Sequence, residues 1–321
     1  MDAGIISSNL LNAPVLFFFL GMFAVWVGSD LSIPQPLPKF FSLYLLMAIG
    51  FKGGTELSKT GINEQLIWVL VFSLLLSFIF PVLLYPVLSR YFGKSDSAAI
   101  AASYGSVSAV TFITAVSLLQ KLQIPYAGYL VAALAVMESP AIISGIVMSR
   151  RNNSESGGLP LKELIREAVF NGSVLVLTGS LVIGMVTGSS GEADLAPFVQ
   201  YLFKGILCLF LLDMGLVSAA RIKGSNTINL TVVLFALIVP LVQAIPGLGV
   251  SWFLNLSTGD AFLFTVLCAG ASYIAVPAAM RLALPDANPG IYVTMALAIT
   301  FPFNVIAGIP LYLYLVTLIT G

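Results

Sequence analysis

Two segments gather small and hydroxyl-bearing residues inside otherwise apolar stretches. They are residues 101–114 (AASYGSVSAVTFIT) and 268–281 (CAGASYIAVPAAMR). A helix that breaks within such a segment leaves backbone groups without intrahelical partners, and its N-terminus attracts anions. The composition therefore favours a small anion held by hydroxyls and backbone N–H groups, with sodium on carbonyl and hydroxyl oxygens. The alternative is structural, because small residues also let membrane helices pack closely.

Two acidic residues lie within apolar runs and are further candidates. Glu138 lies in AVMESPAII, and Asp213 lies in LFLLDMGLV. Ionisable residues inside membrane segments mark ion or proton pathways by default. Either acid could bind a cation, carry a proton or make a structural hydrogen bond, and Asp213 is the secondary candidate. The coupling-ion candidates are Ser103, Tyr104, Thr111, Glu138 and Tyr273.

Composition excludes a soluble fold and most enzyme classes. Hydrophobic residues make up 59% of the 321 residues and charged residues 9%, whereas a soluble domain carries roughly 25% charged residues. The absence of histidine removes Ser–His and Cys–His pairs and histidine-bound metals. Cys208 and Cys268 lie in apolar runs, so no zinc cluster is expected. No basic block suggests nucleic-acid binding. We expect a polytopic membrane protein with no enzymatic activity and no cofactor besides sodium.

Ten apolar segments are long enough to cross a bilayer, which takes about 20 residues. They lie near 13–29, 37–57, 65–90, 97–119, 124–149, 166–188, 197–221, 227–255, 260–283 and 289–319. The fourth and ninth contain the two small-residue segments, so these two spans are expected to be broken helices.

The two halves of the chain share motifs in the same order. LLMAIGFKGG (45–54) aligns with FLLDMGLVSA (210–219), and Gly105 aligns with Gly270. Five spans per half is an odd number, so the second half must enter the membrane from the opposite side. Such an inverted repeat is a common plan of secondary transporters. The expected units are a first repeat at 1–150, a cytoplasmic linker at 151–165 and an inverted second repeat at 166–321.

Lysine and arginine residues are distributed unevenly between the two sides of the membrane in this topology. Ten lie in the connections that follow odd-numbered spans, and three lie on the opposite side. Because positive charge concentrates on the cytoplasmic side, both termini are predicted to lie outside the cytoplasm. Lys52, in IGFKGG, could pair with an intramembrane acid or extend to the membrane surface.

Four segments give the chain a family resemblance. They are LLMAIGFKGGTEL (45–57), YGSVSAVT (104–111), IPYAGYLVAALAVMESPAIIS (124–144) and PAAMRLALPDANPGIYV (277–293). In these the chain resembles the sodium-dependent bicarbonate transporters first described in cyanobacteria (the SbtA type). Its central linker is short, and residues 270–273 (GASY) replace a run of serines and an acid in the family pattern.

The resemblance implies an all-α integral membrane protein with an elevator mechanism. Spans one, two, six and seven would form the gate, and spans three to five and eight to ten the mobile core. It also implies sodium-coupled uptake of bicarbonate or a similar small anion, location in the plasma (inner) membrane, a homotrimer and a PII-like cytoplasmic regulator. By motif position, it assigns anion binding to Gly105, Ser106, Val107, Ser108, Gly270, Ala271 and Ser272.

One other transport mechanism stays open. A proton- or sodium-coupled antiporter, or an organic-anion symporter on a related inverted-repeat fold, would use Glu138 or Asp213 to carry protons. The missing histidine removes the usual proton relay and favours sodium coupling.

Overall fold

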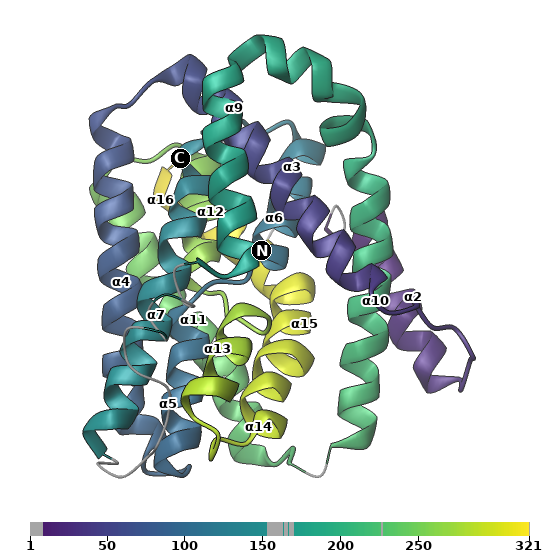
Figure 1. Cartoon of the computed structure of the whole chain (residues 1–321), viewed down its shortest axis with the longest axis vertical. Coiled ribbons are helices and arrows are strands. Elements are labelled where there is room, and N and C mark those ends of the chain that lie inside the picture. Colours follow the sequence, from purple (N-terminus) through teal and green to yellow (C-terminus); the bar gives the residue numbers. More distant parts are fainter. Residues whose placement is uncertain (1–8, 153–162, 164–165, 167–169, 226, 321) are drawn as a thin grey trace.

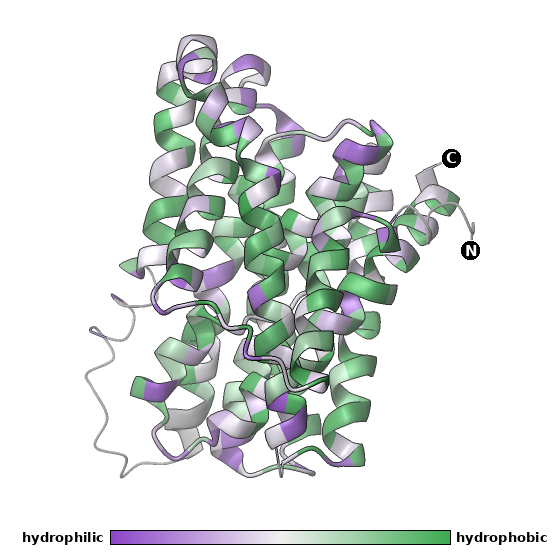
Figure 2. Cartoon of the chain, turned by 90° about the vertical axis from the view of Figure 1, so that its right-hand side faces the viewer, coloured by the Kyte–Doolittle hydropathy of each residue, from purple (hydrophilic) through white to green (hydrophobic). Residues whose placement is uncertain are grey.

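The computed structural model describes residues 9–152, 163, 166, 170–225 and 227–320. Within these ranges every regular element is a helix (Figure 1). The predicted linker at 151–165 lies almost wholly outside the described residues. Hydrophobic residues cover most of the helical surface, and hydrophilic residues gather mostly near the helix ends (Figure 2).

The helices follow one another closely along the chain. In order they are α2 (Ala13–Trp26), α3 (Leu37–Thr60), α4 (Glu64–Leu88), α5 (Lys94–Gly105), α6 (Ala109–Leu122), α7 (Tyr129–Asn152), α9 (Gly172–Ala196), η1 (Pro197–Tyr201), α10 (Phe203–Gly224), α11 (Leu230–Phe253), α12 (Thr258–Cys268), α13 (Ala275–Ala283), α14 (Pro289–Val293), η2 (Thr294–Thr300), α15 (Phe301–Phe303), η3 (Asn304–Gly308) and α16 (Ile309–Thr320).

Six helical stretches among the described residues are long and apolar enough to cross a membrane. They are Glu64–Leu88, Lys94–Leu122, Tyr129–Met148, Gly172–Gly224, Leu230–Phe253 and Pro289–Thr320. The number is smaller than ten partly because helix α9 continues through η1 into α10 and is counted with it, while α2 and α12 are short apolar helices. The expectation of ten spans stays a prediction.

The boundary expected after residue 188 is wrong. Helix α9 continues to Ala196 and leads directly into η1. The polar stretch TGSSGEAD (187–194) lies inside this helix. Only Gly188 departs from helical geometry there, with φ 56° and ψ −141°. A left-handed φ suits glycine, which has no Cβ, so the chain kinks within the helix.

Helices α2, α3, α9 and α10 form one packed group. Helix α2 packs on α10, and α3 packs on α9 and α10. Glycines allow these close crossings: a Cβ on Gly21 or Gly215 would overlap a backbone oxygen across the α2–α10 contact, and one on Gly54 or Gly184 would do so across the α3–α9 contact.

The remaining helices form a second group. Helix α4 packs on α5 and α7, which lie beside it in Figure 1, and α11 packs on α12 and η2. Two helical spans are interrupted within this group. One break separates α5 from α6 at residues 106–108, and the other separates α12 from α13 at residues 269–274. Both breaks fall inside the small-residue segments singled out from the sequence.

Candidate functional site

The two helix breaks lie against each other. The backbone N–H of Ser272 donates to the carbonyl of Ser103 at 2.8 Å. Gly270 lies so close to the other break that a Cβ added there would be 2.8 Å from the Ser108 nitrogen. The interrupted backbone of each segment therefore packs on, and partly satisfies, the other.

A small cavity opens at this crossing. Its volume is about 30 Å³, and one water molecule needs at least about 10–15 Å³, so it has room for a small ion. Residues from α3, α6, α7, α9, α13 and both breaks line it: Ser42, Leu46, Val107, Ser108, Ala109, Val110, Glu138, Ser173, Ser272, Tyr273, Ile274 and Ala275.

Three helix N-termini meet around the cavity. Ala109 and Val110 begin α6, Ala275 begins α13, and Ser173 lies in the first turn of α9. The first N–H groups of a helix have no intrahelical acceptor and carry partial positive charge. Within the described part of the chain, the N–H groups of Ala109, Val110 and Ala275 have no acceptor. This wall of the cavity suits an anion.

Serine side chains shape both helix starts. The Ser108 hydroxyl accepts from the Thr111 N–H at 3.2 Å and from its hydroxyl at 2.8 Å. The Ser272 hydroxyl accepts from the Val276 N–H at 3.2 Å. Serine is a favoured cap because its oxygen satisfies an N–H group that would otherwise have no partner. Thr111 thus fixes the position of Ser108 and does not line the cavity.

Among the residues that the structure describes, Glu138 is the only acid in the cavity wall. It comes from α7, and it forms no salt bridge or hydrogen bond with the described residues. One buried hydroxyl of the neighbouring break, on Ser106, has no hydrogen-bond partner in the described structure. Carboxylate and hydroxyl oxygens are the ligands that a hard cation prefers.

Other predicted residues are engaged elsewhere. The Ser103 hydroxyl donates to the Ala99 carbonyl at 2.9 Å. The Tyr104 hydroxyl is bonded to Thr300 at 2.6 Å, and its carbonyl accepts from Gln243 at 2.7 Å. The Tyr104 contacts join α5 to η2 and α11, whereas the Ser103 hydroxyl bond stays within α5. Neither residue lines the cavity.

The glycines and alanine of the predicted anion set lie behind the cavity wall. Gly105 contacts Pro81 so closely that a Cβ would overlap the proline ring. Gly270 and Ala271 are buried at the crossing and do not line the cavity. Asp213 is buried in α10 and is also absent from the lining. The anion and sodium assignments therefore stay predictions, with Val107, Ser108, Glu138, Ser272 and Tyr273 in the cavity wall.

Sequence reasoning missed two serines of the wall, Ser42 and Ser173. Each lies between apolar residues of its helix with no other signal around it, and only the crossing of α3 and α9 brings it to the breaks. Both also line a neighbouring cavity of about 390 Å³, which lies between α3, α9, α10 and α13 and reaches Lys39. This larger cavity shares four residues with the small one, so it provides an approach to the crossing.

Apolar helices with a small polar cavity between paired helix breaks are the architecture of a multi-pass membrane transport protein. The sequence profile of the Na⁺-dependent bicarbonate transporter superfamily matches residues 13–317, and the chain belongs to that superfamily. The family resemblance seen in four sequence segments is thereby confirmed. Membership implies sodium-dependent bicarbonate transport. The comparison with curated proteins found no match.

Proposed function

We propose that the protein couples sodium to the uptake of bicarbonate, or a similar small monovalent anion, at the crossing of the two breaks. The observation that carries this proposal is the cavity wall itself: three helix N-termini and the carboxylate of Glu138 surround about 30 Å³. The N-termini favour an anion, and the carboxylate favours a cation. Because each ion neutralises part of the charge facing the other, their binding is mutually favourable.

The ligands can be divided by charge. The anion binds at the N–H groups of Ala109, Val110 and Ala275, beside the Ser108 and Ser272 hydroxyls. Sodium binds at Glu138, with backbone and hydroxyl oxygens of the breaks completing its shell. No lysine or arginine of the described ranges lines this cavity, which favours a small monovalent anion over a multiply charged one.

A pair of aspartates supports the inverted repeat of two five-helix halves. Asp96, in the first turn of α5, accepts from the Asn288 N–H at 2.6 Å. Asp260, in the first turn of α12, accepts from the Ala127 N–H at 2.6 Å. Each acid therefore links the start of one broken helix to the turn before the last span of the other half.

The glycine crossings follow the same symmetry. Gly21 and Gly215 join the first span to the seventh, and Gly184 and Gly54 join the sixth to the second. By this symmetry, Gly54 in the first half corresponds to Gly215 in the second half. The sequence motifs instead align Gly50 with Gly215. The proposed repeats are residues 1–150 and 166–321.

The two packed groups support an elevator mechanism. Helices α2, α3, α9 and α10 correspond to the predicted gate, and the helices that carry both breaks correspond to the core. The approach cavity lies between them, with walls from α3, α9 and α10 on one side and α13 on the other. The proposal also includes a homotrimer, a PII-like regulator and location in the plasma membrane, which rest on the family resemblance. It places both termini outside the cytoplasm, which rests on the distribution of positive charge.

Uptake by purified protein in liposomes tests this function. Labelled bicarbonate should accumulate with an inward sodium gradient and not with an equal choline gradient. Ser108→Ala and Ser272→Ala should each weaken this uptake, while Ser251→Ala is the control. Ser251 is also buried, and its hydroxyl bonds within α11 to the Gly247 carbonyl at 2.8 Å. Wild-type uptake in both site variants would exclude the assignment, and uptake driven by a proton gradient without sodium would favour the proton-coupled alternative.

A further inference from the structure

Two more cavities meet at Lys52, away from the crossing. One has a volume of about 190 Å³ and walls from α3, α6, η1 and α10. The other has about 210 Å³ and lies between α3 and residues 124–131. Both have Ile49 and Lys52 in their walls. Lys52 therefore stands at the boundary between two hollows.

The first of these cavities carries positive charge without an acid. Lys52 and Lys204 line it together with the amides of Gln120 and Gln200. No aspartate or glutamate in the described part of the chain is in its wall. Two ammonium groups facing one small space repel each other unless an anion lies between them. Ammonium and amide groups are both hydrogen-bond donors suited to carboxylate-like oxygens.

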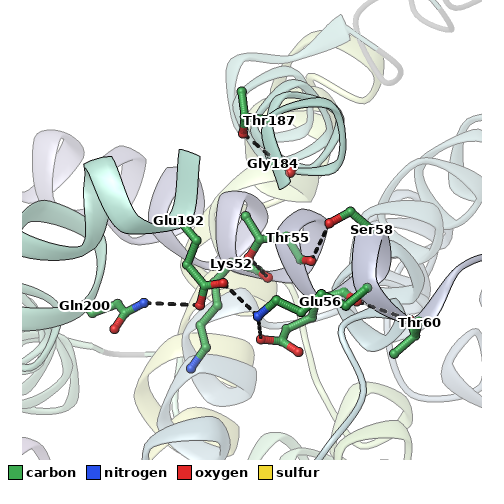
Figure 3. Close-up of polar contacts among 10 residues, drawn as sticks. Lys52, Thr55, Glu56, Ser58, Thr60, Gly184, Thr187, Glu192 and Gln200 are labelled. Carbon is green, nitrogen blue, oxygen red and sulfur yellow. Dashed lines mark hydrogen bonds and ion pairs between the residues drawn. The ribbon is translucent and has the colours of Figure 1, made fainter. Parts of the chain in front are cut away.

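The nearby acids are engaged elsewhere. Lys59 pairs with Glu192 at 2.7 Å and with Glu56 at 3.2 Å, and Glu192 also accepts from the Gln200 amide at 3.4 Å. In Figure 3 the Lys52 side chain runs away from this cluster. Within the described residues Lys52 forms no ion pair, and its ammonium lies 5.9 Å from the centre of the Tyr126 ring. A cation–π contact of this kind replaces only part of the lost hydration.

Helix α3 connects this cavity to the crossing. Ser42 and Leu46 line the small cavity at the breaks, and Ile49 and Lys52 line the lysine cavity. These positions are spaced by three or four residues and therefore share one helix face. Ten residues of helix separate Ser42 from Lys52, or about 15 Å. Only Leu46 and Ile49, both buried, stand between the two cavities on this face.

We propose that the cavity lined by Lys52 and Lys204 is a second anion site, which takes a small soluble oxyanion such as bicarbonate before it reaches the crossing. The lysines provide the charge. Gln120 and the second N–H of the Gln200 amide, whose nitrogen also donates to Glu192, provide further hydrogen bonds. The site contains no carboxylate, so it needs no sodium. The choice of bicarbonate rests on the proposed function, whereas the site itself follows from the charges in the cavity wall.

Carbon-13 line broadening of labelled bicarbonate tests the site, because this measurement detects weak, rapidly exchanging binding. The protein is held in phosphatidylcholine nanodiscs in sodium-free choline buffer. Wild type should broaden the signal, and the double variant Lys52→Gln/Lys204→Gln should lose most of this effect. Lys121→Gln is the matched control, since Lys121 is exposed and lines neither cavity. Ser272→Ala should retain the sodium-free broadening, because that serine lies at the crossing.

Transport gives a second readout. In liposomes each single lysine variant should raise the KM for bicarbonate about tenfold, the usual effect of losing one charge-assisted hydrogen bond, with Vmax within about twofold of wild type. Equal broadening by wild type and the double variant, or none by wild type, would overturn the site. Broadening that disappears when phosphatidylglycerol is added would assign the site to lipid phosphate and overturn the soluble anion. If the wild-type protein showed no sodium-dependent uptake, this result would refute the proposed function and leave the second anion site to the broadening experiment.

Discussion

Gly270→Ala tests whether the contact between the two breaks positions the anion site. The added Cβ would lie 2.8 Å from the Ser108 nitrogen and 3.4 Å from the Val107 Cα. An ordinary Cβ contact is at least 3.4 Å, so one break must move by about 0.6 Å, the difference between 3.4 and 2.8 Å. The Leu267 carbonyl oxygen, at 3.2 Å, is a third close neighbour. All three are backbone atoms, so rotation of a side chain cannot relieve the overlap. Overpacking of this kind costs about 1–3 kcal/mol.

The same displacement should impair transport more than stability. Ser108 caps α6, so its movement shifts the N–H groups of Ala109 and Val110 that line the cavity. A misplacement approaching 1 Å can cost up to about 100-fold in a positioned site. We expect a melting temperature a few degrees below wild type and sodium-dependent bicarbonate uptake reduced at least about tenfold.

The assays are thermal unfolding of the purified protein and initial uptake rates in liposomes with equal amounts of protein. Gly249→Ala is the matched control, because a Cβ at that helical glycine meets nothing within 4 Å. It should keep wild-type uptake and gain roughly 0.5–1 kcal/mol of stability from the better helix propensity of alanine. Wild-type uptake and melting in Gly270→Ala would refute the reasoning about the crossing.

Three further substitutions test separate parts of the structure. Glu138→Gln should raise the sodium concentration for half-maximal uptake about tenfold. Complete loss of transport at saturating sodium would point to proton coupling instead. Gly54→Ala should prevent accumulation of folded protein, because its Cβ would overlap the Leu181 carbonyl; a monodisperse gel-filtration peak at wild-type yield would contradict the α3–α9 packing. Asp260→Asn should lower the melting temperature by several degrees, because the carboxylate accepts from the Tyr129 hydroxyl at 3.0 Å and a lost charged hydrogen bond costs about 1.5–3 kcal/mol.

The sequence predicts the helix breaks well because they have a local cause. Hydroxyl-bearing and small residues surround Ser106, and Pro277 follows the second break. Such residues leave backbone groups in need of partners, and that need is visible without the fold. Glu138 is predicted for the same reason, since an acid in an apolar helix requires an explanation. The structure places it in the cavity wall.

Other features depend on which helices cross. Ser42 and Ser173 resemble any serine in an apolar helix until α3 and α9 bring them to the breaks. Tyr104 looks like a ligand from sequence, yet its hydroxyl finds Thr300, 196 residues away. The helix beyond Gly188 was missed because polar residues indicate a loop only when they do not contact the rest of the protein. Here Glu192 is held by Lys59.

The short barrier that Leu46 and Ile49 form on α3 affects how the membrane voltage acts on transported ions. Hollows reach this helix from both sides, and the two buried residues that separate them lie about 4.5 Å apart along the helix axis. Aqueous hollows conduct ions, so the membrane voltage falls mainly across the narrow barrier between them. One elementary charge carried across 100 mV gains about 2.3 kcal/mol. This energy has opposite signs for sodium and for the anion, so each ion would gain or lose most of it within a single helical turn. Uptake that moves unequal numbers of the two ions should therefore respond to voltage chiefly at the step that carries ions past Leu46.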